Sequence, residues 1–279
     1  LSASIEWAKS TGDEGKWEDF WKKECRAYYF MGKDNIPFHT IRWPAMLMGS
    51  DGLNLPYDVP ANEYLQMEGL KLSTSRNWAV WLPDYLDRFE PDPLRYVLAA
   101  NMPETSDSDF SWREYVRSNN DELVATYGNL VHRVLTMSYR NFDARVPEPG
   151  PLDSAADGLV ANAADRFREI GAGIEACRFR AALGAAMGLA RAANQYLDQK
   201  EPWRAMKNNR DDAATTLWTS LAVINCLKTA LYPFLPFSAQ QVHEFLGFDG
   251  RVEAEVWDFD QIVEAVEPGK LLREPSPLY

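Results

Sequence analysis

From Ser111 to its end, the chain is patterned as amphipathic helices joined by short turns. Ser111 followed by Glu114 forms a capping box for a long first helix, and Asp153 is placed to cap the next one. Apolar residues recur along that first helix at the spacing of one helical face: Leu123, Tyr127, Leu130, Val131, Val134 and Leu135. Further amphipathic segments cover residues 175–197, 211–232 and 238–246. Because short connections place consecutive helices antiparallel, this part is predicted to be an all-α helical bundle.

The first part of the chain has the pattern of an α/β unit. Residues 27–31 read as a buried, aromatic-rich strand that Gly32 ends, and a helix is expected from about residue 36 to Gly49. In such sheets ligands bind at the carboxyl ends of the strands, so Gly32, Asp34 and His39 are candidate site residues. A helix cap or a packed side chain is the alternative interpretation of Asp34 and His39.

A polar loop follows an extended segment at residues 55–65 and has the sequence KLSTSR, from Lys71 to Arg76. It places hydroxyl donors, backbone N–H groups and two fixed positive charges in six residues, which suits the stabilisation of a pentavalent phosphate. A run of this composition is more often a solvated turn, so the loop alone does not identify a phosphate site.

The loop lies in a predicted connector, residues 66–109. After the loop, Asp92 can cap a helix whose first turn suits Pro93. The polar, turn-rich residues 103–109 mark a boundary before the helical part.

Composition narrows the class of protein. The 279 residues are 46% apolar and 25% charged, as in an ordinary globular protein, and a cytoplasmic, non-membrane protein is the expectation. The formal charge of −12 argues against non-specific coating of nucleic acid, but leaves selective contacts through local basic patches open. The isolated Cys25, Cys177 and Cys226 encode neither a disulfide framework nor a cysteine zinc site, and no metal site is expected.

Three stretches carry a resemblance to a known family. They are GKDNIPFHTIRWPAML at residues 32–47, LPYDVPANEYLQMEGLKLSTSR at residues 55–76, and DPLRYVLAANMPET at residues 92–105. In this order and at these intervals they resemble methionyl-tRNA synthetase, a class I aminoacyl-tRNA synthetase. The resemblance covers essentially the whole chain, is strong in the first half and is looser in the bundle.

The resemblance implies the fold and its division. Residues 1–65 would be the second half of a Rossmann-type catalytic domain, residues 66–109 the signature loop with a connector that contacts the tRNA stem, and residues 110–279 an α-helical anticodon-binding domain. The fold class is therefore α/β followed by an all-α bundle.

The resemblance also implies the reaction and its partners. Methionine and ATP, with Mg²⁺ accompanying the ATP, would form methionyl-adenylate, and the methionyl group would pass to tRNA(Met). KLSTS matches the mobile loop usually written KMSKS, with Thr74 in place of the family's second lysine. The loop residues implied in catalysis are Lys71, Ser73, Thr74, Ser75 and Arg76, of which Lys71 and Thr74 would also bind ATP.

Other site residues follow from the same resemblance. Gly32 and Asp34 would approach the adenosine of ATP, and Phe38, His39 and Trp43 would line or support the methionine pocket. Core packing is an equal alternative for Trp43. In the bundle, Asn129 and Arg133 match an N-L-x-x-R pattern that reads the anticodon, and Trp203 matches the aromatic residue that stacks on an anticodon base. By physical pattern alone, the first two are more often a solvated helix face and Trp203 a packed helix start.

One family motif has no match here. Class I synthetases carry an H-x-G-H-like signature, and His39, His132 and His243 do not fit it. We therefore expect the chain to be a fragment that does not activate methionine alone. The alternatives are another class I synthetase for leucine, isoleucine or valine, and a non-catalytic tRNA-binding module; the oligomeric state is not readable from the sequence.

Overall fold

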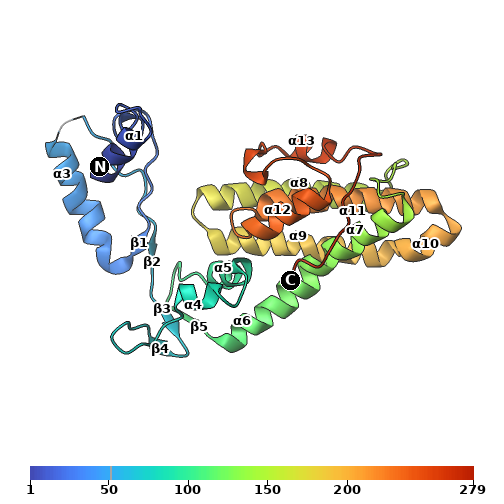
Figure 1. Cartoon of the computed structure of the whole chain (residues 1–279), viewed down its shortest axis with the longest axis horizontal. Coiled ribbons are helices and arrows are strands. Elements are labelled where there is room, and N and C mark those ends of the chain that lie inside the picture. Colours follow the sequence, from blue (N-terminus) through green and yellow to red (C-terminus); the bar gives the residue numbers. More distant parts are fainter. Residues whose placement is uncertain (51) are drawn as a thin grey trace. The chain divides into compact units, whose positions relative to one another are not determined.

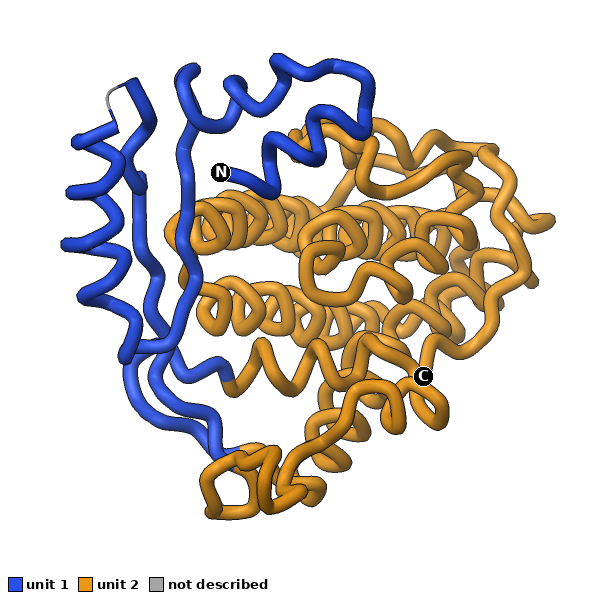
Figure 2. The backbone as a smooth tube through the Cα atoms, turned by 60° about the vertical axis from the view of Figure 1, so that its left-hand side comes forward, with its two compact units in different colours: residues 1–66, 102–109 blue, residues 67–101, 110–279 orange. Residues whose placement is uncertain are grey.

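The computed structural model describes residues 1–50 and 52–279, and the chain forms two compact units. Unit 1 comprises residues 1–66 and 102–109, and unit 2 comprises residues 67–101 and 110–279 (Figure 2). The connector residues 67–101 therefore belong to the same compact unit as the helical bundle. The three-part division at residues 65 and 109 stays a prediction.

Unit 1 is built around a short parallel strand pair (Figure 1). Met31 of β1 pairs with Ala61 of β2, and Gly32 pairs with Asn62. Because a helix lies between the two parallel strands in the chain, this is the predicted β-α-β unit. The elements are α1 (Ser2–Ser10), α2 (Glu18–Trp21), β1 (Met31–Gly32), η1 (Lys33–Asn35), η2 (Phe38–Arg42), α3 (Trp43–Gly49) and β2 (Ala61–Asn62).

The strand predicted at residues 27–31 is shorter and lies further along the chain than the pattern indicated. Regular pairing is confined to β1, but the same parallel register continues upstream, where Tyr28 bridges Asp58 and the Tyr29 and Met31 N–H groups donate to the Asp58 and Pro60 carbonyls at 3.0 and 3.2 Å. Aromatic composition favours an extended backbone, and the ladder is interrupted at Pro60, which has no N–H to donate across to residues 27–31.

Unit 2 contains the helical bundle and the segment of residues 67–101. A three-stranded sheet has the order β4-β3-β5, and the boundary between the units falls within β3 and β5. The elements are β3 (Leu65–Met67), β4 (Leu70–Lys71), α4 (Leu82–Leu86), α5 (Pro91–Ala100), β5 (Ser108–Phe110), α6 (Trp112–Ser118), η3 (Asn119–Gly128), α7 (Asn129–Asn141), α8 (Ser154–Glu175), α9 (Phe179–Lys200), α10 (Pro202–Asn208), α11 (Arg210–Leu231), α12 (Pro236–Phe245), η4 (Val252–Ala254) and α13 (Phe259–Glu264).

The first long helix of the bundle runs through α6, η3 and α7. The Ser111 hydroxyl accepts a hydrogen bond from the Glu114 backbone N–H at 3.1 Å, and the Asp153 carboxylate likewise accepts from Ala156 N–H at 2.9 Å, so both predicted caps are confirmed. The Glu114 carboxylate pairs with Arg117, so the second half of the predicted capping box is replaced by an ion pair. The predicted apolar stripe is buried, with Leu123, Tyr127, Leu130, Val134 and Leu135 all 0% exposed. Sequence patterning did not reveal that Asn119–Gly128 is a π-helix.

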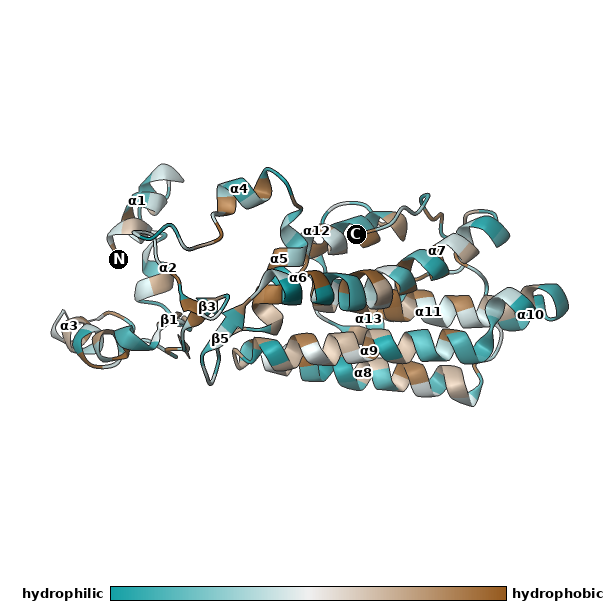
Figure 3. Ribbon diagram, turned by 90° about the horizontal axis from the view of Figure 1, so that it is seen from below, coloured by the Kyte–Doolittle hydropathy of each residue, from teal (hydrophilic) through white to brown (hydrophobic). Residues whose placement is uncertain are grey.

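Helix α11 is the centre of the bundle. Its residues 213–231 are buried apart from Trp218, and it packs against α7, α8, α9, α10, α12 and α13. Figure 3 shows polar and apolar residues alternating along the bundle helices around it. Most buried hydroxyls on α11 donate to a carbonyl one turn earlier in the helix, as when Thr219 Oγ1 donates to the Thr215 carbonyl at 2.9 Å. The core that positions the bundle's surface residues therefore surrounds this helix.

The prediction that Asp92 caps its own helix was wrong in detail. Helix α5 begins at Pro91, so Asp92 lies in its first turn. The Asp92 carboxylate instead accepts hydrogen bonds from the backbone N–H and the hydroxyl of Ser238, both at 2.7 Å. Asp92 thus caps α12, which is far away in the sequence.

Candidate functional site

The signature loop of unit 2 is a tight turn that a tryptophan pair anchors. Lys71 ends β4, and Ser73 pairs with Trp78 through two backbone hydrogen bonds of 2.9 and 3.0 Å. The Trp78 indole N–H donates to the Met67 carbonyl at 3.0 Å, and the Trp81 indole N–H donates to Asn77 Oδ1 at 2.8 Å. The base of the loop is therefore fixed.

The tip of the loop presents its polar groups to solvent. Thr74, Ser75 and Arg76 are exposed, and the Ser73 and Ser75 hydroxyl oxygens lie 3.2 Å apart. Arg76 Nη2 donates to the Lys71 carbonyl at 3.4 Å, so the arginine folds back along the loop. The structure thus gathers two cationic side chains and three hydroxyls on one short turn, an arrangement that can hold a polyphosphate.

Gly32 and Asp34 lie together at the carboxyl end of β1 in unit 1. A Cβ atom added to Gly32 would lie 2.9 Å from Asp34 Oδ1, which is too close for an unshifted side chain. Asp34 is exposed and precedes the helical segment that leads into α3. Glycine leaves room here for the Asp34 carboxylate to take its present position at the end of the strand, where the sequence predicts a ligand.

The three candidate methionine-pocket residues do not point the same way. Trp43 packs edge-on against Trp21 at 6.0 Å between ring centroids, and its indole N–H is buried without a hydrogen-bond partner. His39 stacks obliquely on Tyr29 at 5.9 Å, and its Nδ1 lies 3.2 Å from the Asn35 carbonyl oxygen. These two residues lie one helical turn apart and make inward aromatic contacts.

Phe38 differs from that pair. Its side chain is 48% exposed, and its ring is covered on one side by the Arg42 guanidinium, at 4.5 Å from the centroid. This cation–π contact gives Arg42 a local partner.

The bundle brings Arg133 and Trp203 together from separate helices. Arg133 lies on α7 and Trp203 at the start of α10, and the Arg133 Cζ atom is 5.2 Å from the centroid of the indole. Arg133 Nη2 also donates to Asp198 Oδ1 on α9 at 2.9 Å. The arginine is therefore held between a ring and a carboxylate, while Trp203 keeps 38% of its surface exposed.

Asn129 lies one helical turn before Arg133 on α7 and is exposed. It lines a small cavity of about 170 Å³ with His132, Gly128, Val124, Pro277 and Tyr279. An exposed amide, a guanidinium and an indole therefore occupy one surface of the bundle, a combination able to bond and stack with unpaired bases. Asp198 was missed from the sequence, because nothing local marks an acidic residue on another helix as the partner of Arg133.

Two kinds of feature are absent from the part of the chain that the structure describes. Within residues 1–50 and 52–279, no group of three or more His, Cys, Asp or Glu side chains is arranged to hold a metal ion. Among the helices of that same part of the chain, none is long and apolar enough to cross a membrane.

Comparison with known proteins agrees with this geometry. The family model of class I (M) tRNA synthetases matches residues 1–135, and the model of the anticodon-binding domain of methionyl-tRNA ligase matches residues 146–279. The fold and these two matches define the chain as part of a class I aminoacyl-tRNA synthetase.

Individual relatives narrow the class. Methionine–tRNA ligases of Roseiflexus castenholzii and of Dehalococcoides mccartyi strain 195 are each 51% identical over all of this chain, which spans 52% and 50% of their lengths. A structure of Mycobacterium tuberculosis methionyl-tRNA synthetase in complex with methionyl-adenylate is 29% identical, with a TM-score of 0.82 over 90% of this chain and 49% of that one. The chain belongs to the methionyl-tRNA synthetase family, and it spans about half the length of the curated relatives it matches.

Proposed function

We propose that the protein to which this chain belongs is a methionine–tRNA ligase that works in the cytoplasm. The methionine carboxylate attacks the α-phosphorus of ATP, and pyrophosphate leaves as methionyl-adenylate forms. A hydroxyl of the terminal ribose of tRNA(Met) then attacks the methionyl carbonyl carbon, and AMP leaves. The similarity of the whole chain to methionine–tRNA ligases favours methionine over leucine, isoleucine or valine.

The observation that carries this proposal is the contact between Arg133 and Trp203. The two residues are 70 positions apart in the sequence, yet the guanidinium lies over the indole, and Asn129 lies one turn away. In this proposal, Trp203 stacks on an anticodon base, and Asn129 and Arg133 bond to base edges. The match of residues 146–279 to an anticodon-binding domain covers Trp203 and supports its part of the assignment.

The loop from Lys71 to Arg76 would act on the phosphates of ATP. Lys71 and Arg76 would provide positive charge beside the α-phosphate as it becomes pentavalent, and the hydroxyls of Ser73, Thr74 and Ser75 would donate hydrogen bonds. Mg²⁺ would arrive bound to the phosphates of ATP. Catalysis by orientation and charge needs no covalent intermediate with the protein.

The first unit would hold the rest of the substrates. The open end of β1 at Gly32 would receive the adenosine, with the Asp34 carboxylate accepting hydrogen bonds from ribose hydroxyls. Phe38 would line the methionine pocket with its exposed ring, while His39 and Trp43 would support the pocket from behind.

Replacement of Trp203 by alanine in the full-length enzyme tests the anticodon role. Trp203→Ala should reduce tRNA charging by about 5- to 150-fold and leave methionine-dependent ATP–pyrophosphate exchange unchanged, because a lost stacking contact costs about 1–3 kcal/mol of RNA binding. Trp203→Phe should retain most of the charging activity. Equal loss of both activities would show a folding defect and contradict the role.

Replacement of Lys71 by alanine tests the phosphate role. Adenylate formation should fall by roughly 10²-fold or more, because an electrostatic donor to a transition state typically contributes that much. Lys16→Ala removes an equal charge from an exposed position outside the proposed site and serves as the control. Adenylate formation within about threefold of the wild type would remove Lys71 from catalysis.

A further inference from the structure

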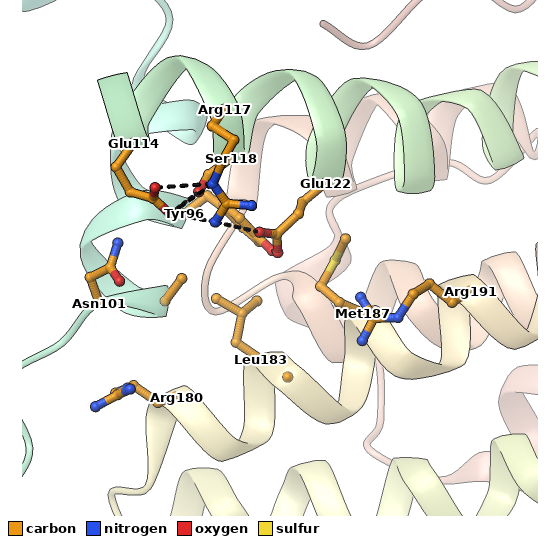
Figure 4. A pocket seen from close by; sticks show the side chains of 12 residues that line it. Tyr96, Asn101, Glu114, Arg117, Ser118, Glu122, Arg180, Leu183, Met187 and Arg191 are labelled. Atoms are coloured by element: carbon orange, nitrogen blue, oxygen red, sulfur yellow. Dashed lines mark hydrogen bonds and ion pairs between the residues drawn. The ribbon is translucent and has the colours of Figure 1, made fainter. Parts of the chain in front are cut away.

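A second polar cavity opens on the bundle, outside the residues assigned above. It has a volume of about 220 Å³ and lies between α5, the helix formed by α6 and η3, and α9 (Figure 4). Arg117 enters from α6, and Arg180 and Arg191 border the cavity from α9. Three guanidinium groups around one cavity stand out in a chain of net charge −12.

The carboxylates of this cavity are already partnered. Arg117 forms an ion pair with Glu114, and it lies 4.0 Å from Glu122. The Tyr96 hydroxyl donates a hydrogen bond to the other oxygen of Glu122. As Figure 4 shows, these contacts are all on the α5 and α6 side of the cavity, so its acidic charge is satisfied there.

The side of the cavity formed by α9 carries two arginines with a glycine between them. Arg191 takes part in none of the ion pairs among residues 1–50 and 52–279. Between Arg180 and Arg191 lies Gly184, where an added Cβ would meet no atom within 4 Å. The 11 positions between the two arginines correspond to about 16 Å along a helix. A chain of phosphates can therefore approach the helix backbone closely between two cations.

This cavity and the proposed anticodon-binding residues lie along one seam, the line of contact between two neighbouring helices. The helix from α6 to α7 and helix α9 run side by side in the same direction: Glu122 and Met187 line the cavity, Asn194 Nδ2 then bonds to the Thr126 carbonyl at 3.0 Å, and Arg133 next bonds to Asp198. Arg191 precedes Asp198 by seven positions, or about 10 Å of helix. An RNA bound at Arg133 and Trp203 that extends along α9 would therefore follow this seam and reach Arg191 first.

We infer that the cavity binds successive phosphodiesters of the RNA backbone, on the side of α9 that leads away from the nucleotides that Trp203 and Arg133 read. The inference rests on the proposed function, because the RNA is the same tRNA. Arg180 and Arg191 supply the positive charge that attracts the phosphates, whereas the charge of Arg117 is already paired with Glu114. A backbone contact carries no base specificity, so it strengthens binding of any tRNA that follows the seam.

Binding of tRNA transcripts to the full 279-residue chain tests this inference. Arg191→Gln and Arg180→Gln should each weaken binding on the order of fivefold, by the same factor for a transcript with the CAU anticodon and for one with a changed anticodon. The slope of log affinity against log salt should become shallower by about 0.7–1 for each variant. Arg168→Gln removes the same charge from an exposed site on α8 and should change neither quantity.

A variant that narrows the cavity without changing its charge tests whether the RNA enters the cavity. Gly184→Leu fills the mouth of the cavity where the backbone has room, so it should fold normally and also weaken binding of both transcripts. Wild-type affinity in Gly184→Leu together with both arginine variants would overturn the inference. Protection of the chain against heat by inorganic phosphate, lost in Arg191→Gln without any change in tRNA affinity, would also overturn it, because the site would then serve a free anion.

The same measurements separate this inference from the proposed function. A wild-type chain that does not prefer the CAU transcript contradicts the anticodon role of Trp203. A wild-type chain that does prefer it, with unchanged affinity in the cavity variants, contradicts only the backbone site.

Discussion

The guanidinium of Arg133 is clamped between the indole of Trp203, at 5.2 Å from its centroid, and the carboxylate of Asp198, at 2.9 Å. The three residues come from α7, α10 and α9, so the position of Arg133 depends on how three helices pack. An arginine fixed in this way loses less conformational entropy when it binds a base than a free one would. Asp198 is thereby assigned as a positioning residue for the proposed anticodon contact.

Replacement of Asp198 should reduce discrimination more than affinity. Asp198→Ala frees Arg133 to move, so the ratio of affinities for CAU and changed-anticodon stem-loops should fall at least threefold, because a charge-assisted hydrogen bond no longer fixes the guanidinium. Overall affinity can rise, since a negative charge beside the RNA is removed. Binding of both stem-loops by fluorescence anisotropy measures the ratio.

Asp165→Ala serves as the control for Asp198→Ala. It removes an exposed carboxylate, paired with Arg168 on α8, and should leave the ratio unchanged. An unchanged ratio in Asp198→Ala would show that Trp203 alone orients Arg133.

The tertiary cap at Asp92 makes a prediction about stability. Asp92 is 2% exposed, and its carboxylate bonds to both the backbone N–H and the hydroxyl of Ser238. Asp92→Ala should lower the free energy of unfolding by roughly 2 kcal/mol, because the buried Ser238 groups lose their acceptor. Urea unfolding followed by circular dichroism measures this value.

Asp92→Asn should lose less than Asp92→Ala, because an amide oxygen can still accept the bonds. Equal losses would instead identify the negative charge at the start of α12 as the stabilising feature.

The helical half was predictable from sequence because its determinants are local. The stripe from Leu123 to Leu135 and the caps at Ser111 and Asp153 each need only a few neighbouring residues to specify them, and all were found in place. The role of Asp92 was not predictable, since its partner lies 146 positions away. The regular length of the strand predicted at residues 27–31 was not predictable for the same reason, because it depends on the partner segment, where Pro60 interrupts the ladder.

The candidate sites divide in the same way. Residue types and family resemblance indicated the loop at Lys71–Arg76 and the residues Asn129, Arg133 and Trp203, but no spacing rule connects α7 with α10. The pairing of Asp198 with Arg133 and the arginine-lined cavity could not be predicted from the sequence. Both depend on how α9 packs against the helix that runs from α6 to α7. Long-range pairs of this kind carry no local sequence signal.

Two glycines in the long bundle helices should respond differently to alanine. Gly184 in α9 has open space around an added Cβ, so Gly184→Ala should raise the free energy of unfolding by about 0.5–1 kcal/mol through helix propensity. Gly173 in α8 would place a Cβ 3.1 Å from the Cβ of Ala182, so Gly173→Ala should show no such gain. Thermal or urea unfolding of the two variants checks the difference; equal gains would show that α8 and α9 are not closely packed at Gly173.

The buried carboxylate of Glu255 predicts how stability depends on pH. Lys228, which is 0% exposed, donates to Glu255 at 2.6 Å, and His243 on α12 and the Thr229 hydroxyl also contact this carboxylate. Burial alone would raise the pKa of Glu255, but the hydrogen bonds from His243, Lys228 and Thr229, with the charge of Lys228, lower the pKa to about 2. Lys270 is the further cation whose charge interacts with Glu255.

A carboxyl whose pKa is lower in the folded state stabilises the protein above its unfolded pKa. That contribution, on the order of 3 kcal/mol, should be lost as the pH falls from about 4.5 towards about 2. In Glu255→Gln this part of the acid transition should disappear, and the protein should already be less stable at pH 7 by roughly 3 kcal/mol, because Lys228 is left buried without its partner. Urea unfolding at a series of pH values measures both effects.

Two further variants complete the test of Glu255. Glu253→Gln changes an exposed carboxylate nearby and should alter stability by less than about 1 kcal/mol. The double variant Lys228→Met with Glu255→Gln removes the unpaired charge as well, so it should be more stable than Glu255→Gln alone. A double variant that is no more stable than Glu255→Gln would show that desolvation of Lys228 is not the source of the loss, and that the carboxylate acts through His243 and Thr229 instead.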